Sequence, residues 1–312
     1  MSKLEYVELY PKVDIYRNVL KDQNSLKKMV IGLEYFRRMK VMSKPDHLLI
    51  KKITAPNGGV FTGGGTNTYI IGINDVTIID PGPIEESHAK NILDTYGDRI
   101  KRILVTHTHM DHSPLAMPLS KKLDVPLMGM TIEDNMDYQD ESFKPTSHLQ
   151  DGDLIETDEY TIEAVHTPGH ASNHLCYLIK DNNCLITGDH IMQGSTVVIA
   201  PPDGNMRDYL LSLEKLKNYK IDFLAPGHGE YIHKPFEAVD WIVNHRLKRE
   251  AKVLNKLQKQ GKISLDDLVL EVYDDVDSRL HTIALASLEA HLLKLQEEKI
   301  AEFDGTFWSC IN

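Results

Sequence analysis

Thr106-His107-Thr108-His109-Met110-Asp111-His112 is the stretch of sequence that decides the fold. It directly follows an apolar run at 100–105, which we predict to be a β-strand. Alternate residues of an extended loop face the same side, so His107, His109 and Asp111 can converge. His112 then points into a neighbouring space. Three imidazoles and a carboxylate packed so closely indicate a metal site.

Three later segments each place one more imidazole or carboxylate just beyond a predicted strand. Every segment carries a glycine beside the candidate ligand, which lets the backbone turn sharply. One such segment alone is a weak signal, but their shared form after separate strands favours a common site. The segments are Pro168-Gly169-His170 after 161–165, Thr187-Gly188-Asp189 after 184–186, and Pro226-Gly227-His228-Gly229 after 221–224.

Short apolar runs alternate with helical periodicity up to about residue 235, and this alternation indicates an α/β fold. The helices are expected at 85–96 and at 206–218, where apolar residues recur at spacings of three and four. The runs expected to form strands are 48–53, 68–73, 76–80, 100–105, 154–155, 161–165, 175–179, 184–186, 197–199 and 221–224.

The pattern changes near Phe236, where helical periodicity takes over. A new helix is expected to begin at Ser264, another to span 283–298, and two short strands to flank Asp304-Gly305. Three helices and a terminal hairpin are typical of a small winged-helix-like domain. We therefore divide the chain into an N-terminal helical extension at 1–46, the α/β domain that carries the ligands at 47–235, and a winged-helix-like domain at 236–312.

Composition narrows the setting of the protein. Three cysteines without a C-x-x-C pair argue against a disulfide scaffold. No apolar run approaches the roughly 18 residues of a membrane span, and no secretory signal is readable, so we expect a cytoplasmic protein. The formal net charge of −11 argues weakly against nucleic acid as a partner. The segment 246–262 is basic, and we interpret it as the solvated face of a helix.

Several further residues are candidates for supporting a ligand by hydrogen bonding. Asp80 stands at the end of a predicted strand, and His166, His174 and His190 lie close to ligands in the sequence.

The glycine cluster at 58–65 is read as a tight turn rather than a phosphate-binding loop. No G-K-[ST] follows it and no helix opens there.

The segment H-T-H-M-D-H, with P-G-H, G-D and P-G-H-G downstream, resembles the metallo-β-lactamase superfamily. Within that superfamily, 55–72 (A-P-N-G-G-V-F-T-G-G-G-T-N-T-Y-I-I-G) and 245–254 (H-R-L-K-R-E-A-K-V-L) resemble the lactamase-beta-2-like branch. The resemblance runs from about residue 47 to the end. It implies a four-layer αβ/βα sandwich followed by a winged-helix-like domain.

The resemblance also implies two metal ions held by seven residues. Nitrogen and oxygen ligands without cysteine suit zinc, with manganese and iron as alternatives. One ion would take His107, His109 and His170, the other would take Asp111, His112 and His228, and Asp189 would bridge the two.

Two such ions can share a hydroxide that attacks a carbonyl or phosphoryl centre, with Asp111 as the catalytic residue that orients it. We expect the scissile bond to be an ester, thioester, lactone or related bond in a small-molecule or acyl substrate; no oligomeric state is predicted. Single-stranded RNA is the alternative substrate, because this branch includes endoribonucleases. A mononuclear iron persulfide dioxygenase is a further alternative with a similar histidine pattern. A non-catalytic binding module is disfavoured, because all seven ligands are present.

Overall fold

The computed structural model describes residues 50–132 and 138–311, so the helix expected within the N-terminal extension lies outside the described residues. The described chain divides into two compact units, one that ends at Val239 and one that begins at Asp240. No helix within the described ranges combines the length and the apolar character that a bilayer crossing requires.

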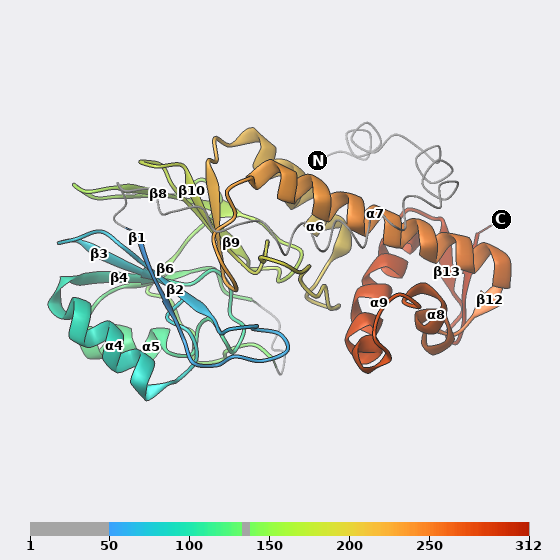
Figure 1. Cartoon of the computed structure of the whole chain (residues 1–312), viewed down its shortest axis with the longest axis horizontal. Coiled ribbons are helices and arrows are strands. Elements are labelled where there is room, and N and C mark those ends of the chain that lie inside the picture. Colours follow the sequence, from blue (N-terminus) through green and yellow to red (C-terminus); the bar gives the residue numbers. More distant parts are fainter. Residues whose placement is uncertain (1–49, 133–137, 312) are drawn as a thin grey trace. The chain divides into compact units, whose positions relative to one another are not determined.

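The first unit contains two sheets (Figure 1). One has six strands in the order β1-β2-β3-β4-β5-β6. Its first three strands pair antiparallel, and β3 to β6 pair parallel. The strands are β1 (Ile50–Thr54), β2 (Asn67–Ile71), β3 (Val76–Ile79), β4 (Ile100–Leu104), β5 (Leu127–Gly129) and β6 (Ser147–His148).

The second sheet has five strands in the order β11-β10-β9-β8-β7. Only β10 and β11 pair parallel, and the other neighbours are antiparallel. The strands are β7 (Leu154–Glu156), β8 (Thr161–His166), β9 (Leu175–Ile179), β10 (Cys184–Gly188) and β11 (Phe223–Pro226).

Successive side chains of a β-strand point to opposite faces of the sheet, and in the first sheet both sets of side chains are buried. On β2, Tyr69 and Ile71 pack with residues of the second sheet, such as Tyr177 and Ile186. Ile70, between them in sequence, belongs to a separate core that contains helix residues. The six-stranded sheet therefore lies between the other sheet and a helical layer.

Helices complete the layers of this unit. Figure 1 shows α4 (Glu86–Tyr96) and α5 (Ala116–Leu123) on the outer side of the six-stranded sheet. α6 (Met206–Lys215) buries Leu210 and Leu213, and Ser212 Oγ donates to Pro168 O at 2.8 Å, beyond the end of β8. Helix, sheet, sheet and helix form the expected αβ/βα sandwich.

The second unit is built on α7, which begins in the first unit. Its core joins Val253, Leu268, Leu288 and Trp308 from the helices and the terminal strand. β12, β14 and β13 form a three-stranded antiparallel sheet in that order, as in a winged helix. The elements are α7 (Pro235–Gln260), β12 (Lys262–Ile263), α8 (Leu265–Val272), α9 (His281–Glu297), β13 (Ala301–Phe303) and β14 (Trp308–Cys310).

Two expectations from the sequence are corrected by the structure. Residues 197–199 form no strand, and the carbonyl of Val198 instead accepts a hydrogen bond from His170 Nδ1 at 2.7 Å. The basic segment at 246–262 is not simply solvated. Arg246 and Arg249 are buried, and acidic residues of the same unit pair with Arg249, Lys252, Lys256 and Lys262.

Candidate metal centre

The seven predicted ligands meet because the strands that precede them, β4, β8, β10 and β11, end at one edge of the sandwich. β3 and β4 run parallel, which places Asp80 beside Thr106 at the start of the loop 105–112. β10 and β11 also run parallel, and Gly227 N donates to Gly188 O at 2.8 Å. This bond aligns the turns that carry Asp189 and His228. The loop after β8 contributes His170 to the same edge.

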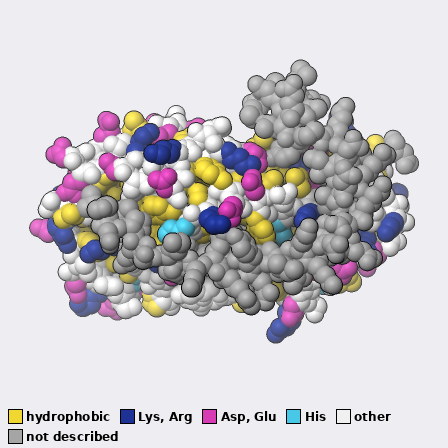
Figure 2. Space-filling model, turned by 45° about the horizontal axis from the view of Figure 1, so that its top comes forward, with side chains coloured by type: hydrophobic (Ala, Val, Ile, Leu, Met, Phe, Trp, Pro, Cys, Tyr) yellow, Lys and Arg dark blue, Asp and Glu magenta, His cyan; other side chains and the backbone are white. Residues whose placement is uncertain are grey.

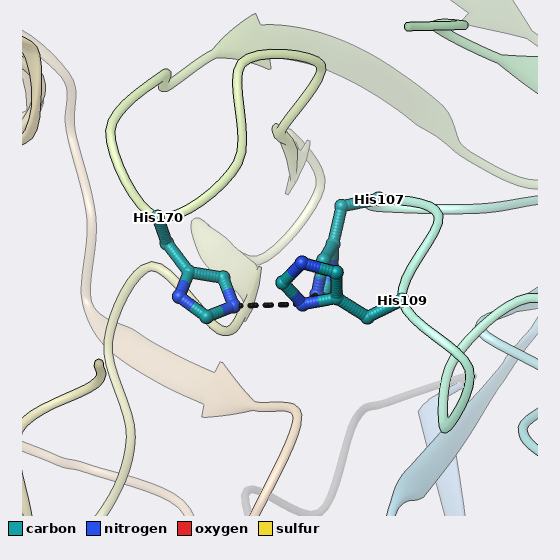
Figure 3. A group of neighbouring side chains, drawn as sticks. All are labelled: His107, His109 and His170. Carbon is teal, nitrogen blue, oxygen red and sulfur yellow. Dashed lines mark hydrogen bonds between the residues drawn. The ribbon is translucent and has the colours of Figure 1, made fainter. Parts of the chain in front are cut away.

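Three imidazoles form one group of candidate ligands (Figure 3). His109 Nδ1 lies 2.9 Å from His107 Nε2 and 3.0 Å from His170 Nε2. The other nitrogens of two of these rings bond outward, His107 Nδ1 to Thr106 Oγ1 at 3.0 Å and His170 Nδ1 to Val198 O at 2.7 Å. Neutral imidazole carries one N–H, so these two rings direct lone pairs inward.

Asp111, His112 and His228 form a second group next to the first. Asp111 Oδ2 lies 3.2 Å from His228 Nε2 and 3.4 Å from His112 Nε2. Asp189 reaches both groups. Its Oδ1 lies 3.2 Å from His228 Nε2 and 3.4 Å from His112 Nε2, and its Oδ2 lies 3.7 Å from His170 Nε2.

These residues fit a pair of divalent cations. Tetrahedral zinc with Zn–N bonds of about 2.0–2.1 Å separates its ligand nitrogens by roughly 3.3 Å, close to the spacing of the three imidazoles. His112 Nε2 and Asp189 Oδ1 are buried without a hydrogen-bond partner among the described residues. Such atoms are costly unless an ion or water satisfies them.

Electrostatics in the second group favour cations. Burial alone raises the pKa of Asp111, but His112 and His228 outweigh it and bring that pKa to about 2. Burial lowers the pKa of His228, yet Asp189 and Asp111 raise it to about 10. Protons therefore occupy the imidazoles that face the carboxylates, and a metal ion must displace them.

Burial dominates in the first group. It lowers the pKa of His107 well below its ordinary value, helped by His112 and the other neighbouring imidazoles. Burial and His170 lower the pKa of His109 to about 3, against the opposing effect of Asp189. Neutral imidazole is the form that binds metal, so these rings are ready to coordinate.

Asp80 supports two candidate ligands, although it lies in neither group. Its Oδ2 accepts from His112 Nδ1 at 2.8 Å and from Thr106 Oγ1 at 2.7 Å. Because Thr106 Oγ1 also contacts His107 Nδ1, the same carboxylate reaches His107 through a hydroxyl. Asp80 is buried and has a φ of 51°, in the left-handed region that aspartate tolerates better than most residues.

The other predicted supporting residues are placed differently. His174 Nε2 accepts from Asp189 N at 3.2 Å. His190 is buried, with its ring 5.3 Å from that of Tyr209. His166 Nε2 lies 2.9 Å from Ser172 O, on the loop that carries His170.

Two supporting contacts come from a segment that the sequence did not single out for this purpose. Thr66 Oγ1 donates to Asp111 Oδ2 at 3.2 Å, and Gly65 O accepts from His228 Nδ1 at 3.1 Å. Their loop lies more than forty positions from the nearest ligand in the chain. The glycine cluster before Thr66 was the available signal, since it marks a sharp turn next to the site.

Apolar side chains are exposed on the loop 105–112 and on the turn at 58–65 that leads to Thr66. Met110 stands between ligands and is 52% exposed, and Val60 and Phe61 are 78% and 60% exposed at the tip of the turn before Thr66. Figure 2 shows hydrophobic side chains (yellow) exposed among charged side chains (dark blue and magenta) on the face that it presents. The surroundings of the centre are thus partly apolar.

The family model described as "Metallo-beta-lactamase superfamily" matches residues 61–228, the segment that contains all seven candidate ligands. The chain belongs to the metallo-beta-lactamase superfamily. It is a hydrolase of this superfamily, and the fold implies that it binds divalent metal. A second model, "Beta-lactamase associated winged helix domain", matches residues 264–308. The predicted superfamily, branch and fold class are therefore confirmed.

Relatives of this superfamily member align along most of their length. It is 29% identical over 262 residues to "Beta-lactamase-like protein 2 homolog" of Caenorhabditis elegans, covering 81% of this chain and 86% of the relative. It is 25% identical over 272 residues to "Atrochrysone carboxyl ACP thioesterase dmxR1" of Cryptosporiopsis, covering 81% of both. A beta-lactamase domain protein from Burkholderia ambifaria shares the fold, with a TM-score of 0.73 at 22% identity over 86% of this chain and 93% of that structure.

Proposed function

We propose that this hydrolase uses two zinc ions to cleave a thioester or related ester bond in an acyl substrate. The observation that carries the proposal is the position of Asp189, whose two carboxylate oxygens face different ligand groups. One carboxylate shared in this way suits two neighbouring cations. When bound, such ions lower the pKa of water to about 7 and polarise a carbonyl oxygen.

Asp111 is the residue placed to handle the attacking water. Its side chain is 29% exposed, against 11% for Asp189, so it is the more open of the two carboxylates. The bond from Thr66 Oγ1 fixes Asp111 Oδ2, and the low pKa of Asp111 keeps this oxygen a hydrogen-bond acceptor at neutral pH. Asp111 therefore orients a water molecule toward the substrate carbonyl.

The substrate class is supported by the surface and by relatives. The exposed Val60, Phe61 and Met110 suit an acyl group better than a polyanion. Relatives named as acyl carrier protein thioesterases align over most of this chain. The basic segment 246–262, in α7 and β12, would be the natural contact for RNA, but acidic residues of the same unit pair with much of it. Lys256 Nζ lies 3.1 Å from Glu271 and Lys262 Nζ lies 2.6 Å from Asp304.

A substrate panel with zinc-loaded protein tests this proposal. Acyl thioesters, esters, lactones and single-stranded RNA are compared at low and moderate salt, because phosphate contacts make RNA binding salt-sensitive. We expect thioester cleavage that a chelator abolishes and zinc restores. RNA cleavage without acyl hydrolysis would contradict the proposal in favour of a nuclease. Activity with one iron per chain and oxygen consumption would instead indicate a persulfide dioxygenase.

A further inference from the structure

Four of the five candidate imidazole ligands are fixed by a hydrogen bond from the ring nitrogen that faces away from the centre. The acceptors are Thr106 for His107, Asp80 for His112, Val198 for His170 and Gly65 for His228. Bonds of this kind set the orientation and tautomer of a ligating histidine.

His109 is the exception. Its Nδ1 faces His107 and His170, while its Nε2 is buried and has no hydrogen-bond partner among the described residues. Figure 3 shows the contact between His109 and His170, which involves the other nitrogen of the His109 ring, Nδ1. A different contact must therefore hold this ring.

Tyr138 provides that contact. Its ring centroid lies 5.5 Å from that of His109, with 70° between the planes, which is an edge-to-face arrangement. Aromatic pairs with this geometry contribute stabilisation beyond the area that they bury. Tyr138 is 39% exposed, so it lies at the surface of the site.

The residues after Tyr138 hold it firmly against the ligand loop. Gln139 forms an antiparallel bridge with His109, and its side chain accepts from Thr108 Oγ1 and donates to Asp203 at 3.1 Å. Asp140 N donates to Thr108 O at 2.7 Å. The backbone thus sets the place of the tyrosine ring relative to His109.

We propose that Tyr138 is a positioning residue that orients the His109 imidazole toward the first metal position by ring packing, in place of the missing hydrogen bond. The inference rests on the proposed two-metal function. It assigns the role to the aromatic ring and not to the hydroxyl.

Stepwise zinc affinities measured by chelator competition test this role. We expect Tyr138→Leu to lower the affinity for one of the two zinc ions about tenfold. This is the lower end of the loss in metal affinity that follows when a ligand loses a supporting residue. The affinity for the other zinc ion should equal that of the wild type, and the metal-free variant should unfold at the same temperature as the metal-free wild type. Tyr138→Phe, which keeps the ring, should retain the wild-type affinities. Phe307→Leu removes an exposed aromatic ring in the second unit and serves as the matched control.

The outcomes separate the two proposals. If the wild type binds two zinc ions and Tyr138→Leu binds both with unchanged affinity, the role of Tyr138 is wrong and the proposed function stands. A loss in Tyr138→Phe equal to that in Tyr138→Leu would assign the effect to the hydroxyl and also overturn the inference. A wild type that binds no metal overturns both.

Discussion

At the scale of the residue, the centre consists of ligands and the groups that hold them. His112 shows the principle: one nitrogen faces two carboxylates of the centre, and the other is fixed by Asp80. The clustering of the seven candidate ligands was predictable, because such side chains have few other uses in this sequence pattern. Val198 and Gly65 could not be predicted as supporting residues. They accept hydrogen bonds through their backbone carbonyls, which every residue type possesses.

Asp111→Ala should lower turnover of the zinc-loaded protein at least about 100-fold, because the carboxylate that orients water is lost. The fold should remain, since Asp111 lies on a partly exposed loop. Steady-state kinetics at saturating zinc, with circular dichroism as the fold check, measures the effect. Asp158→Ala, an exposed aspartate away from the centre, is the control. Equal rates in the two variants would remove Asp111 from the mechanism.

Asp80→Asn should lower zinc affinity about 10- to 100-fold, the usual effect of losing an outer partner of a ligand. Asparagine tolerates the left-handed backbone at this position, so the change isolates the carboxylate from the turn. Its single carbonyl oxygen cannot replace both oxygens that receive bonds from Thr106 and His112. Isothermal titration with zinc measures the change, and wild-type affinity would show that Asp80 is not a support.

At the scale of the element, strand ends determine where the ligands meet. The longer strands and helices were predicted within a few residues, because their apolar periodicity is clear. α5, β5, β6 and β12 were not predicted; the three strands have three, two and two residues, too few to show a period. The prediction of a strand at 197–199 was wrong. The buried apolar residues there belong to a loop whose Val198 carbonyl accepts a hydrogen bond from His170.

The turn after β11 leaves no room for a side chain at Gly227. A Cβ there would lie 2.8 Å from Asp189 Oδ1 and 2.8 Å from His112 Cε1. Gly227→Ala should therefore displace two ligands and reduce zinc binding below two ions per chain, as measured by elemental analysis after dialysis. Gly64→Ala, where a Cβ meets nothing within 4 Å, should keep both ions. Full zinc content in Gly227→Ala would show that the ligands are not where the structure places them.

At the scale of the whole molecule, the two units have separate cores and different buried charges. The first concentrates its buried ionisable groups at the metal centre. The second buries Glu250, whose carboxylate accepts from Lys294 at 2.7 Å and contacts His291 at 3.1 Å. Periodicity placed this glutamate on a helix, but only the packing of α9 against α7 reveals that it is fully buried.

The second unit should lose stability in acid because of Glu250. Burial alone raises the pKa of Glu250, but His291 and Lys294 bring that pKa down from its ordinary value of 4.5 to about 2. Its contribution is therefore complete above pH 4.5 and lost as the pH falls toward 2, on the order of 3 kcal/mol. Urea unfolding followed by tryptophan fluorescence reports on this unit, because Trp241 and Trp308 both lie in it.

Glu250→Gln is the matched variant for this experiment. It should unfold more readily at neutral pH, because the buried Lys294 loses one of its two carboxylate partners and keeps only Glu298, at 2.9 Å, among those that face its ammonium group in the described chain. It should also lose most of the stability change between pH 4.5 and 2. A variant with the same acid profile as the wild type would assign that change to other carboxylates.

The metal content of the purified protein tests the proposed two-metal centre most directly. Zinc is removed with a chelator, restored in excess, and counted by elemental analysis after exhaustive dialysis, beside a variant that combines His107→Ala and His228→Ala. We expect two zinc ions per chain in the wild type and fewer than one in the variant. A folded wild type that retains no metal, or a variant that retains two ions, would contradict this expectation.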